Sequence, residues 1–416
     1  MVYELIDKTT RGRPRFQLTL ACPPFQRKPD MKHSNLSSCL FGVISLTIAA
    51  SSQAQNSLVP EQFGPYPVGV TSLQLDDHSR VDPETGGPRQ LLTEIWYPAI
   101  DSASDLAPNK FSEFILRGAA EDFIEVAEEG LSGYREGITV AELDQSFENI
   151  AVRDVGVRDG EWPLILFSHG SGGTRFGYIY FVEHMASHGY VVMSADHTGN
   201  ARFTFLDGKP VVSGGERAAN SATDRPNDIS FLLDSMIKMN AGTDSRFAGR
   251  VNLDQVAVSG MSFGGSTSIN VLNQDARVKA GVMLAPGGPT MERKNPTTPI
   301  MMVIGTEDSV IGAAGNARNR NYYETSEGPR YLVEILDAGH MTFTSVNQYN
   351  PNYGRGFGTG TRITNDEPLT YIDADEAHTI TAAYALAFFN TYVRGIDGFA
   401  GFLRENHYGD KIIFRR

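Results

Sequence analysis

Cysteine is almost absent from this sequence. Only Cys22 and Cys39 occur in 416 residues, and both lie near the N-terminus. Residues 55–416 therefore offer no thiol for a disulfide, a zinc–thiolate site or a cysteine nucleophile. Covalent chemistry in the body of the chain has to use another side chain.

Positive charge is scarce after residue 54. Residues 1–54 hold seven of the 36 basic residues and three of the 49 acidic residues, which leaves 29 against 46 and a net charge of −17 for the rest. A body this acidic repels nucleic acids and anionic lipids. We expect no nucleic-acid partner and no stable membrane anchor.

Long hydrophobic runs are missing except at Leu40–Ala50, which has the length of a signal-peptide core and is too short for a comfortable bilayer span. It follows the basic start Met31-Lys32-His33 and precedes a small-x-small cleavage site at Ser52-Gln53-Ala54. The segment therefore predicts a signal peptide from Met31 to Ala54, a mature N-terminus at Gln55, and a secreted or periplasmic protein. Residues 1–30 fit no secretory element and are interpreted as an over-called reading frame. A membrane-anchored or long signal is the alternative.

With 41% hydrophobic residues, the rest of the chain can build one large core. Apolar runs suited to strands buried on both faces alternate with helical segments from Trp162 onward, after two strand-like runs joined by a turn-rich stretch. This rhythm predicts a single α/β domain over 55–416, with a mostly parallel eight-stranded sheet flanked by helices and residues 102–150 as an insertion or cap. The strand-like runs are 71–75, 91–98, 163–167, 190–195, 255–259, 279–285, 299–304 and 331–336; helices are expected at 176–188, 227–240, 262–273 and 376–394.

The sharpest motif is Gly260-Met261-Ser262-Phe263-Gly264-Gly265, which follows a strand-like run and opens a helix-like one. Glycines two positions before and after the serine allow a turn too tight for side chains, which exposes the serine hydroxyl at the carboxyl end of the sheet. The helix N-terminus adds positive potential for a developing anion. This context predicts Ser262 as a nucleophile.

A serine nucleophile needs a base, and the base needs an orienting acid. Asp308 and His340 each follow a predicted strand, so both fall at the sheet edge that carries Ser262. We predict a triad of Ser262, His340 as base and Asp308 as the orienting acid. His378 is the alternative base and Glu307 the alternative acid, while Asp196 is a weaker rival that we expect to brace the loop of His197.

Acyl transfer also needs donors for an oxyanion. The glycine-rich stretch Ser168–Gly173 follows another predicted strand, and glycine lets backbone approach a ligand closely. We predict the backbone N–H groups of Ser171 and Phe263 as the oxyanion hole, with His169 bracing the loop. Met261 and Phe176 are predicted to line the substrate site, together with aromatic residues of the long 341–371 stretch. Ordinary core packing is the equal alternative for each of these side chains.

With these motifs the chain resembles the α/β-hydrolase superfamily, and within it the esterases similar to platelet-activating-factor acetylhydrolase and dienelactone hydrolase. Supporting stretches are LLTEIWYPA early in the chain, SHGSGG, and Arg225-Pro226-Asn227-Asp228 before a helix. The resemblance covers roughly residues 65–395. It implies hydrolysis of carboxylic esters through an acyl-enzyme, with no cofactor. Met261 stands where relatives commonly carry a large ring, and the cysteine chemistry of true dienelactone hydrolases is rejected because Ser262 takes that place.

The sequence thus predicts a secreted serine hydrolase acting on small-molecule or polymeric esters, of short or medium chain length, with polyester and phospholipid-type esters included. A serine peptidase or amidase on the same fold and a non-catalytic binding protein are the alternatives. No metal site is expected: the one H-x-x-x-H pair, His184 and His188, has Met185 where a zinc protease carries glutamate. Oligomeric state is left open.

Overall fold

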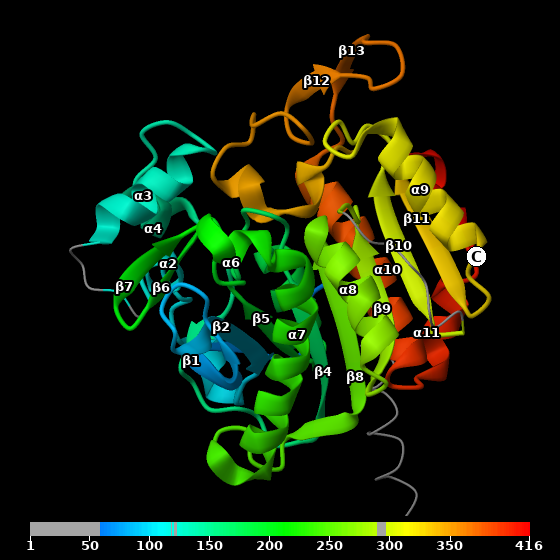
Figure 1. Cartoon of the computed structure of the whole chain (residues 1–416). Coiled ribbons are helices and arrows are strands. Elements are labelled where there is room, and N and C mark those ends of the chain that lie inside the picture. The colour runs from blue at the N-terminus through cyan, green and yellow to red at the C-terminus, as the bar shows by residue number, and fades with distance from the viewer. Residues whose placement is uncertain (1–58, 118, 120–122, 289–296) are drawn as a thin grey trace, which may run out of the picture. The chain divides into compact units, whose positions relative to one another are not determined.

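The structure is a computed structural model that describes residues 59–117, 119, 123–288 and 297–416 (Figure 1). The chain divides into two units, Met1–Ser52 and Gln53–Arg416, and the fold below is that of the second. The predicted signal peptide, its cleavage site, the start at Met31 and both cysteines lie outside the described residues.

A ten-stranded mixed sheet forms the centre of the second unit, in the order β14-β11-β10-β9-β8-β4-β5-β2-β1-β3. The six strands from β11 to β5 run parallel, while β1, β2 and β14 pair antiparallel to their neighbours β2, β5 and β11. The bounds are β1 Val68–Val81, β2 Pro88–Pro98, β3 Val152–Arg153, β4 Trp162–Ser168, β5 Val191–Ala195, β8 Val251–Met261, β9 Val278–Leu284, β10 Ile300–Gly305, β11 Arg330–Ile335 and β14 Ile412–Arg415.

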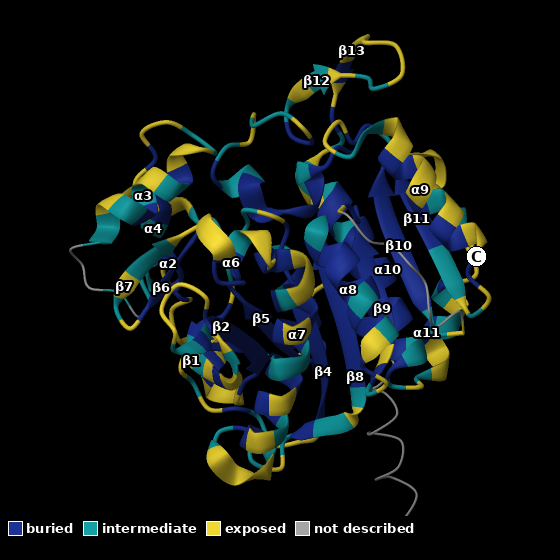
Figure 2. Cartoon of the chain, in the orientation of Figure 1, coloured by how far each residue is buried: buried dark blue, intermediate teal, exposed yellow. Residues whose placement is uncertain are grey.

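The predicted α/β fold with a mostly parallel sheet is confirmed, and all eight predicted strands are present. The count of eight was wrong because two short edge strands escaped the sequence pattern. β3 has only two residues, and β14 is a four-residue strand at the chain end. Every residue of β4, β5 and β10 is buried, as Figure 2 shows, which explains why the central strands are continuous apolar runs.

Helices cover both faces of the sheet. α5 and α10 belong to one apolar core, and α7, α8 and α9 pack into the other. The side chain of Asp373 caps α10 by accepting from the N–H groups of Asp375 and Glu376. The bounds are α5 Ile179–Ser187, α6 Gly215–Ala219, α7 Ser221–Lys238, α8 Phe263–Gln274, α9 Gly312–Glu324, α10 Ala374–Tyr392 and α11 Asp397–Phe402.

Two helix predictions need correction. α7 begins at Ser221 and not at 227, so Pro226 is its sixth residue and removes only a bond close to the helix start. α9 was not predicted, because its sequence GAAGNARNRNYYE carries no apolar stripe and buries mainly Tyr322 and Tyr323.

The segment between β2 and β4 forms small helices beside the sheet. They are η1 Asp101–Asp105, α2 Phe111–Ile115, α3 Ile124–Ser132 and α4 Val140–Ser146. Phe111 and Phe114 of α2 pack against the ring of Phe176, and Phe111 also contacts Tyr349. An aromatic cluster therefore fastens the insertion to two loops of the main body.

The 341–375 segment, without clear structure in its sequence, is ordered by short elements. It holds the 3₁₀ turns η4 (Met341–Phe343) and η5 (Ser345–Gln348) and the hairpin β12 (Thr359–Thr361) and β13 (Pro368–Thr370). A second small hairpin, β6 (Phe203–Leu206) and β7 (Lys209–Val212), follows β5, and a last 3₁₀ turn, η6 (Gly409–Lys411), precedes β14. None of the helices that the structure describes has the length and apolarity to cross a bilayer.

Candidate active site

Ser262 occupies the turn between β8 and α8, in a strained backbone conformation with φ 55° and ψ −119°. The flanking positions require glycine, because backbone carbonyl oxygens lie too close to them for a side chain. A Cβ on Gly260 would lie 2.4 Å from the carbonyl oxygen of Gly264, and one on Gly264 would lie 1.8 Å from that of Ser168. The Ser262 N–H donates to the carbonyl oxygen of Leu284 at 2.8 Å, which fixes the turn over the neighbouring strand.

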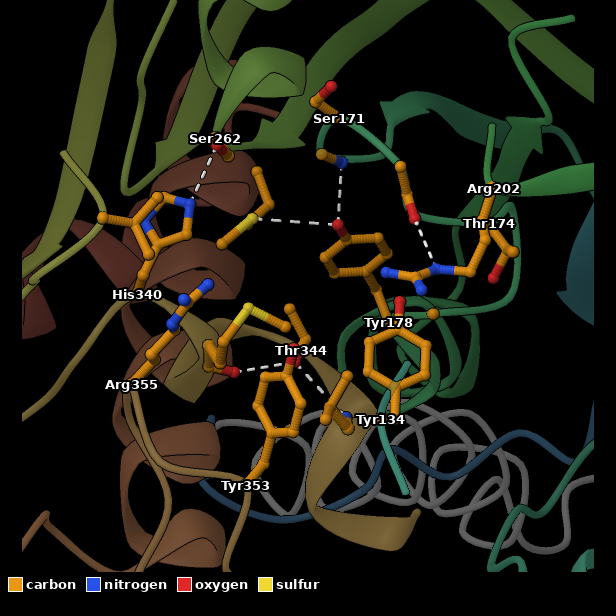
Figure 3. A pocket seen from close by; sticks show the side chains of 18 of the residues that line it. Tyr134, Ser171, Thr174, Tyr178, Arg202, Ser262, His340, Thr344, Tyr353 and Arg355 are labelled. Carbon is orange, nitrogen blue, oxygen red and sulfur yellow. Dashed lines mark hydrogen bonds between the residues drawn. The ribbon is translucent and has the colours of Figure 1, made fainter. Parts of the chain in front are cut away.

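His340 and Asp308 come to Ser262 from the loops after β11 and β10. His340 Nε2 lies 2.9 Å from Ser262 Oγ (Figure 3). His340 Nδ1 lies 2.6 Å from Asp308 Oδ2. Asp308 is fully buried and His340 is 5% exposed, whereas Ser262 is partly open to solvent. The structure brings together all three residues of the predicted triad.

The second oxygen of Asp308 is also held. Its Oδ1 accepts from the backbone N–H groups of Val310 and Ile311, both at 3.0 Å. A carboxylate with these donors presents a fixed acceptor to the imidazole, so His340 carries its proton on Nδ1 and turns the lone pair of Nε2 toward the serine. This is the tautomer that removes a hydroxyl proton.

The predicted oxyanion donors lie beside the serine. Phe263 is the first residue of α8, so its N–H is one of those that a helix leaves without an intrahelical acceptor. The carbonyl oxygen of Gly170 accepts from His169 Nδ1 at 2.6 Å and from the Gly173 N–H at 3.0 Å. Because N–H and C=O point in opposite directions across a peptide, these bonds fix the direction of the Ser171 N–H, which has no acceptor among the described residues.

A second serine–histidine–aspartate arrangement lies beneath this loop. Ser168 Oγ is 2.9 Å from His197 Nε2, and His197 Nδ1 is 2.9 Å from Asp228 Oδ2. All three side chains are fully buried. Arg225 donates to Ser168 Oγ at 3.0 Å, which occupies an oxygen lone pair that a nucleophile would need. The set of Ser168, His197 and Asp228 braces the loop, and its burial closes it to a substrate.

Burial keeps the imidazoles of this region neutral. Burial lowers the pKa of His197 to about 4 and holds the pKa of His169 well below its ordinary value. Burial opposes ionisation of Asp228 as well, but the charge of Arg89 and bonds from Arg89 and His197 lower its pKa. Burial also lowers the pKa of Arg225 to about 9, since no carboxylate pairs with this guanidinium directly in the described part of the chain.

Arg225 connects both sides of the oxyanion region. It hydrogen-bonds the carbonyl oxygen of His169, donates to Asn200 Oδ1 at 2.6 Å and lies 4.5 Å from the ring centre of Phe263. The two backbone segments that carry the predicted oxyanion donors therefore rest on one buried side chain.

A cavity of about 240 Å³ opens in front of Ser262 and His340 (Figure 3). Its walls come from six separate parts of the chain: the insertion, the 170–178 loop, the β5–β6 connection, the β8–α8 turn, the loop after β10 and the 340–355 segment. Residues that line it, besides Ser262 and His340, are Tyr134, Gly170–Thr174, Gly177, Tyr178, Arg202, Met261, Val310, Met341, Thr344, Val346, Tyr349, Tyr353 and Arg355.

Two family models match the chain. The PET hydrolase-like family matches residues 177–357, and platelet-activating factor acetylhydrolase, isoform II, matches residues 50–211. Together they span the insertion, the oxyanion loop and all three triad residues. The chain is a serine esterase of the α/β-hydrolase superfamily.

Individual relatives of this esterase agree with the family models. The platelet-activating factor acetylhydrolase of Cavia porcellus is 24% identical over 372 residues, which cover 82% of this chain and 79% of that protein. Cutinase est2 of Thermobifida alba is 23% identical over a match that covers 45% of this chain and 55% of the cutinase. A ferulic acid esterase structure from Streptomyces cinnamoneus shares the fold, with a TM-score of 0.63 and 21% identity over 85% of this chain and 97% of the other.

The rival residues of the esterase have other partners. His378 is buried, stacks on Tyr180 and donates from Nε2 to the carbonyl oxygens of Thr342 and Thr344 at 3.0 and 3.1 Å. Burial lowers its pKa to about 4. His378 thus supports the segment after His340 and does not reach Ser262.

The rival carboxylates likewise face away from the imidazole of His340. Glu307 accepts from Arg362 and from the Ile363 N–H, both at 2.9 Å. Asp196 accepts from the Arg175 N–H at 2.7 Å and pairs with the Arg175 guanidinium at 2.6 Å. The Nε2 atoms of His184 and His188, the pair weighed as a metal site, contact backbone carbonyl oxygens at 2.9 and 2.8 Å.

One predicted substrate residue is misplaced. Met261 lines the cavity, but Phe176 is 1% exposed and packs among Phe111 and Phe114. The prediction for Phe176 was wrong, because sequence spacing does not show that Phe111 and Phe114 of the insertion pack against its ring. Tyr349 and Tyr353 of the 341–371 stretch do line the cavity, whereas Phe357 and Tyr371 do not.

Sequence reasoning missed Tyr134, Tyr178, Arg202 and Arg355 in the cavity wall. Tyr178 has the most direct role, since its hydroxyl accepts from the Gly170 N–H at 2.7 Å and lies 3.7 Å from Met261 Sδ. Burial raises the pKa of Tyr178, so the hydroxyl stays protonated. The only sequence sign was a tyrosine just after the glycine-rich loop.

Replacing Tyr178 with phenylalanine should lower kcat about tenfold with a smaller change in KM. The change strands the buried N–H of Gly170 and loosens the peptide that carries the Ser171 donor. Steady-state kinetics on a soluble ester measure the effect. Tyr180→Phe is the matched control, because its buried hydroxyl has no partner among the described residues. Equal losses in both variants would contradict a role for the Tyr178 hydroxyl in positioning the loop.

Proposed function

We propose that this esterase cleaves carboxylic esters through an acyl-enzyme at Ser262. The observation that carries the proposal is the continuous hydrogen-bonded line from Asp308 through His340 to the strained, partly exposed Ser262. His340 takes the hydroxyl proton as Ser262 Oγ attacks the ester carbonyl carbon, and it gives that proton to the departing alcohol. Water then attacks the acyl-enzyme, again with His340 as base, and releases the acid and the free serine.

The oxyanion that forms at each attack would be held by the N–H groups of Ser171 and Phe263. Both groups face a fixed position, since the first belongs to a peptide pinned by His169 and the second begins α8. Such preorganised donors stabilise the transition state more than the ester carbonyl itself. Each is worth about 10²-fold in rate or more.

We propose that the preferred substrates are esters with short acyl groups, because these fit the cavity in front of Ser262. The cavity volume of about 240 Å³ lies below the roughly 300–1,000 Å³ of sites that enclose drug-sized ligands. Relatives named as acetylhydrolases support a small acyl group on a phospholipid-type alcohol. The cutinase and PET hydrolase-like matches support a polyester, whose bulk would remain outside the cavity.

A series of p-nitrophenyl esters from acetate to palmitate tests the proposal. We expect kcat/KM to be highest for acetate or butyrate and at least about tenfold lower for palmitate, because the cavity cannot enclose a long chain. The matched amide, p-nitroacetanilide, should react far more slowly. Absence of ester hydrolysis by folded protein would refute the proposed function, and a maximum at palmitate would refute the short-acyl assignment.

We also propose that the protein is exported. The apolar run Leu40–Ala50 and the small-x-small site Ser52-Gln53-Ala54 support this. Sequencing the N-terminus of protein recovered outside the cytoplasm should give Gln55 first, and an intact N-terminal segment would overturn the assignment.

A further inference from the structure

Two arginines face the cavity in front of Ser262. Arg202 comes from the connection between β5 and β6, and Arg355 comes from the loop after η5. In Figure 3 their guanidinium groups point into the same hollow from opposite sides. No Asp or Glu of the described residues lines this cavity, although the protein as a whole carries a net charge of −13.

Among the residues that the structure describes, only neutral groups hold Arg202 in place. Its Nε donates to the carbonyl oxygen of Gly172 at 3.1 Å, and its backbone N–H donates to that of Gly173 at 3.0 Å. Its guanidinium lies over the ring of Tyr134, 4.3 Å from the ring centre. These contacts fix the plane of the group without neutralising its charge. Arg202 is thus a rigid cation on the rim of the oxyanion loop.

Arg355 is held through its backbone. Its φ of 52° is a left-handed conformation that strains the backbone of a non-glycine residue. Its carbonyl oxygen accepts from the Met341 N–H at 2.8 Å, and a Cβ on Gly339 would come within 2.5 Å of that oxygen. The strained turn is therefore packed against the two residues that flank His340. The Arg355 guanidinium has no ion-pair or hydrogen-bond partner in the described part of the chain.

We propose that Arg202 and Arg355 form a subsite for an anionic oxygen group, a carboxylate or a phosphate, on the ester substrate. This rests on the proposed function, and it narrows the substrate class to esters that carry an anion away from the scissile carbonyl. Guanidinium groups bind both kinds of oxyanion through charge-assisted hydrogen bonds. Half-esters of dicarboxylic acids, which include the chain ends released from a polyester, supply a carboxylate. Acetylated glycerophospholipids supply a phosphate.

Matched pairs of esters test the subsite in the full-length protein. Monoethyl terephthalate is compared with diethyl terephthalate, and a 1-alkyl-2-acetylglycerophosphocholine with the corresponding 1-alkyl-2-acetylglycerol. We expect kcat/KM to favour the anionic member of at least one pair. Arg355→Gln and Arg202→Gln should each lower this anionic-to-neutral ratio about tenfold, mainly through KM. The pair that responds identifies carboxylate or phosphate as the source.

Controls separate the subsite from general damage and from failure of the enzyme itself. Arg355→Lys keeps a positive charge and should restore part of the ratio. Arg404→Gln removes an exposed arginine at the end of α11, away from the cavity, and should leave the ratio unchanged. A wild-type preference for the neutral members, or equal losses on both members of a pair in Arg355→Gln and Arg202→Gln, would overturn the subsite. If wild-type protein hydrolysed no ester, the proposed function would fail, and calorimetric binding of terephthalate to Ser262→Ala would still decide the subsite.

Discussion

Ser262→Ala should lower kcat by roughly 10⁴- to 10⁶-fold while the protein folds normally. The variant removes a hydroxyl that is hydrogen-bonded to His340 and open to the cavity. Alanine has the same Cβ as serine, so the left-handed backbone at this turn gains no new strain. Initial rates on p-nitrophenyl acetate, with a thermal melt of each protein, measure the effect.

Ser168→Ala is the matched control for that experiment. Ser168 has a histidine at the same distance and an aspartate behind it, but it is fully buried and accepts from Arg225. A fluorophosphonate probe should label wild type and Ser168→Ala and fail to label Ser262→Ala. Probe labelling that persists in Ser262→Ala and disappears in Ser168→Ala would transfer the nucleophile to the buried serine.

The two serine–histidine–aspartate sets show what chemistry requires beyond residue types. Both have hydrogen bonds near 2.9 Å from serine to imidazole. They differ in access and in what else the serine oxygen bonds. Ser262 lies in a strained turn at the cavity. Ser168 lies under the oxyanion loop, where its oxygen accepts a hydrogen bond from the Arg225 guanidinium. Because the set of Ser168 is buried, it supports the oxyanion loop and does not meet a substrate.

The turn that carries Ser262 and the triad partners Asp308 and His340 could be predicted, because each depends on local sequence. A strand, a glycine-bounded serine and a helix occupy consecutive residues, and Asp308 and His340 each follow a strand that places them at the same sheet edge. The six central strands were recognisable for the same reason, as short runs buried on both faces. Edge strand β14 lacked that pattern because it pairs on one side only.

The cavity wall could not be predicted because it depends on contacts between distant segments. Tyr134 lies under Arg202, and Arg202 is bonded to Gly172 and Gly173, although these residues come from three parts of the chain. Phe176 follows the same oxyanion loop in sequence but turns into the aromatic cluster of the insertion. Spacing along a sequence places a residue on an element, and only packing decides which way its side chain faces.

Asp308→Asn should lower kcat by roughly 10³- to 10⁴-fold with little change in KM. The carboxylate accepts on both oxygens, from the His340 ring through Oδ2 and from the Val310 and Ile311 N–H groups through Oδ1. An amide has one oxygen, so it can satisfy only one side. If the amide nitrogen faces the imidazole, Nδ1 becomes the acceptor and Nε2 carries the proton, which leaves no base for Ser262. If it faces the loop, two backbone donors lose their acceptor.

Glu307→Gln is the control for this prediction, because the neighbouring carboxylate is also buried but binds Arg362 and the Ile363 N–H. Its loss disturbs the β12–β13 side of the site and leaves the imidazole of His340 oriented. We therefore expect a fall in kcat of less than about tenfold for Glu307→Gln. Steady-state kinetics of the two variants on one ester compare them directly. A larger loss in Glu307→Gln than in Asp308→Asn would make Glu307 the orienting acid and would contradict the geometry at His340 Nδ1.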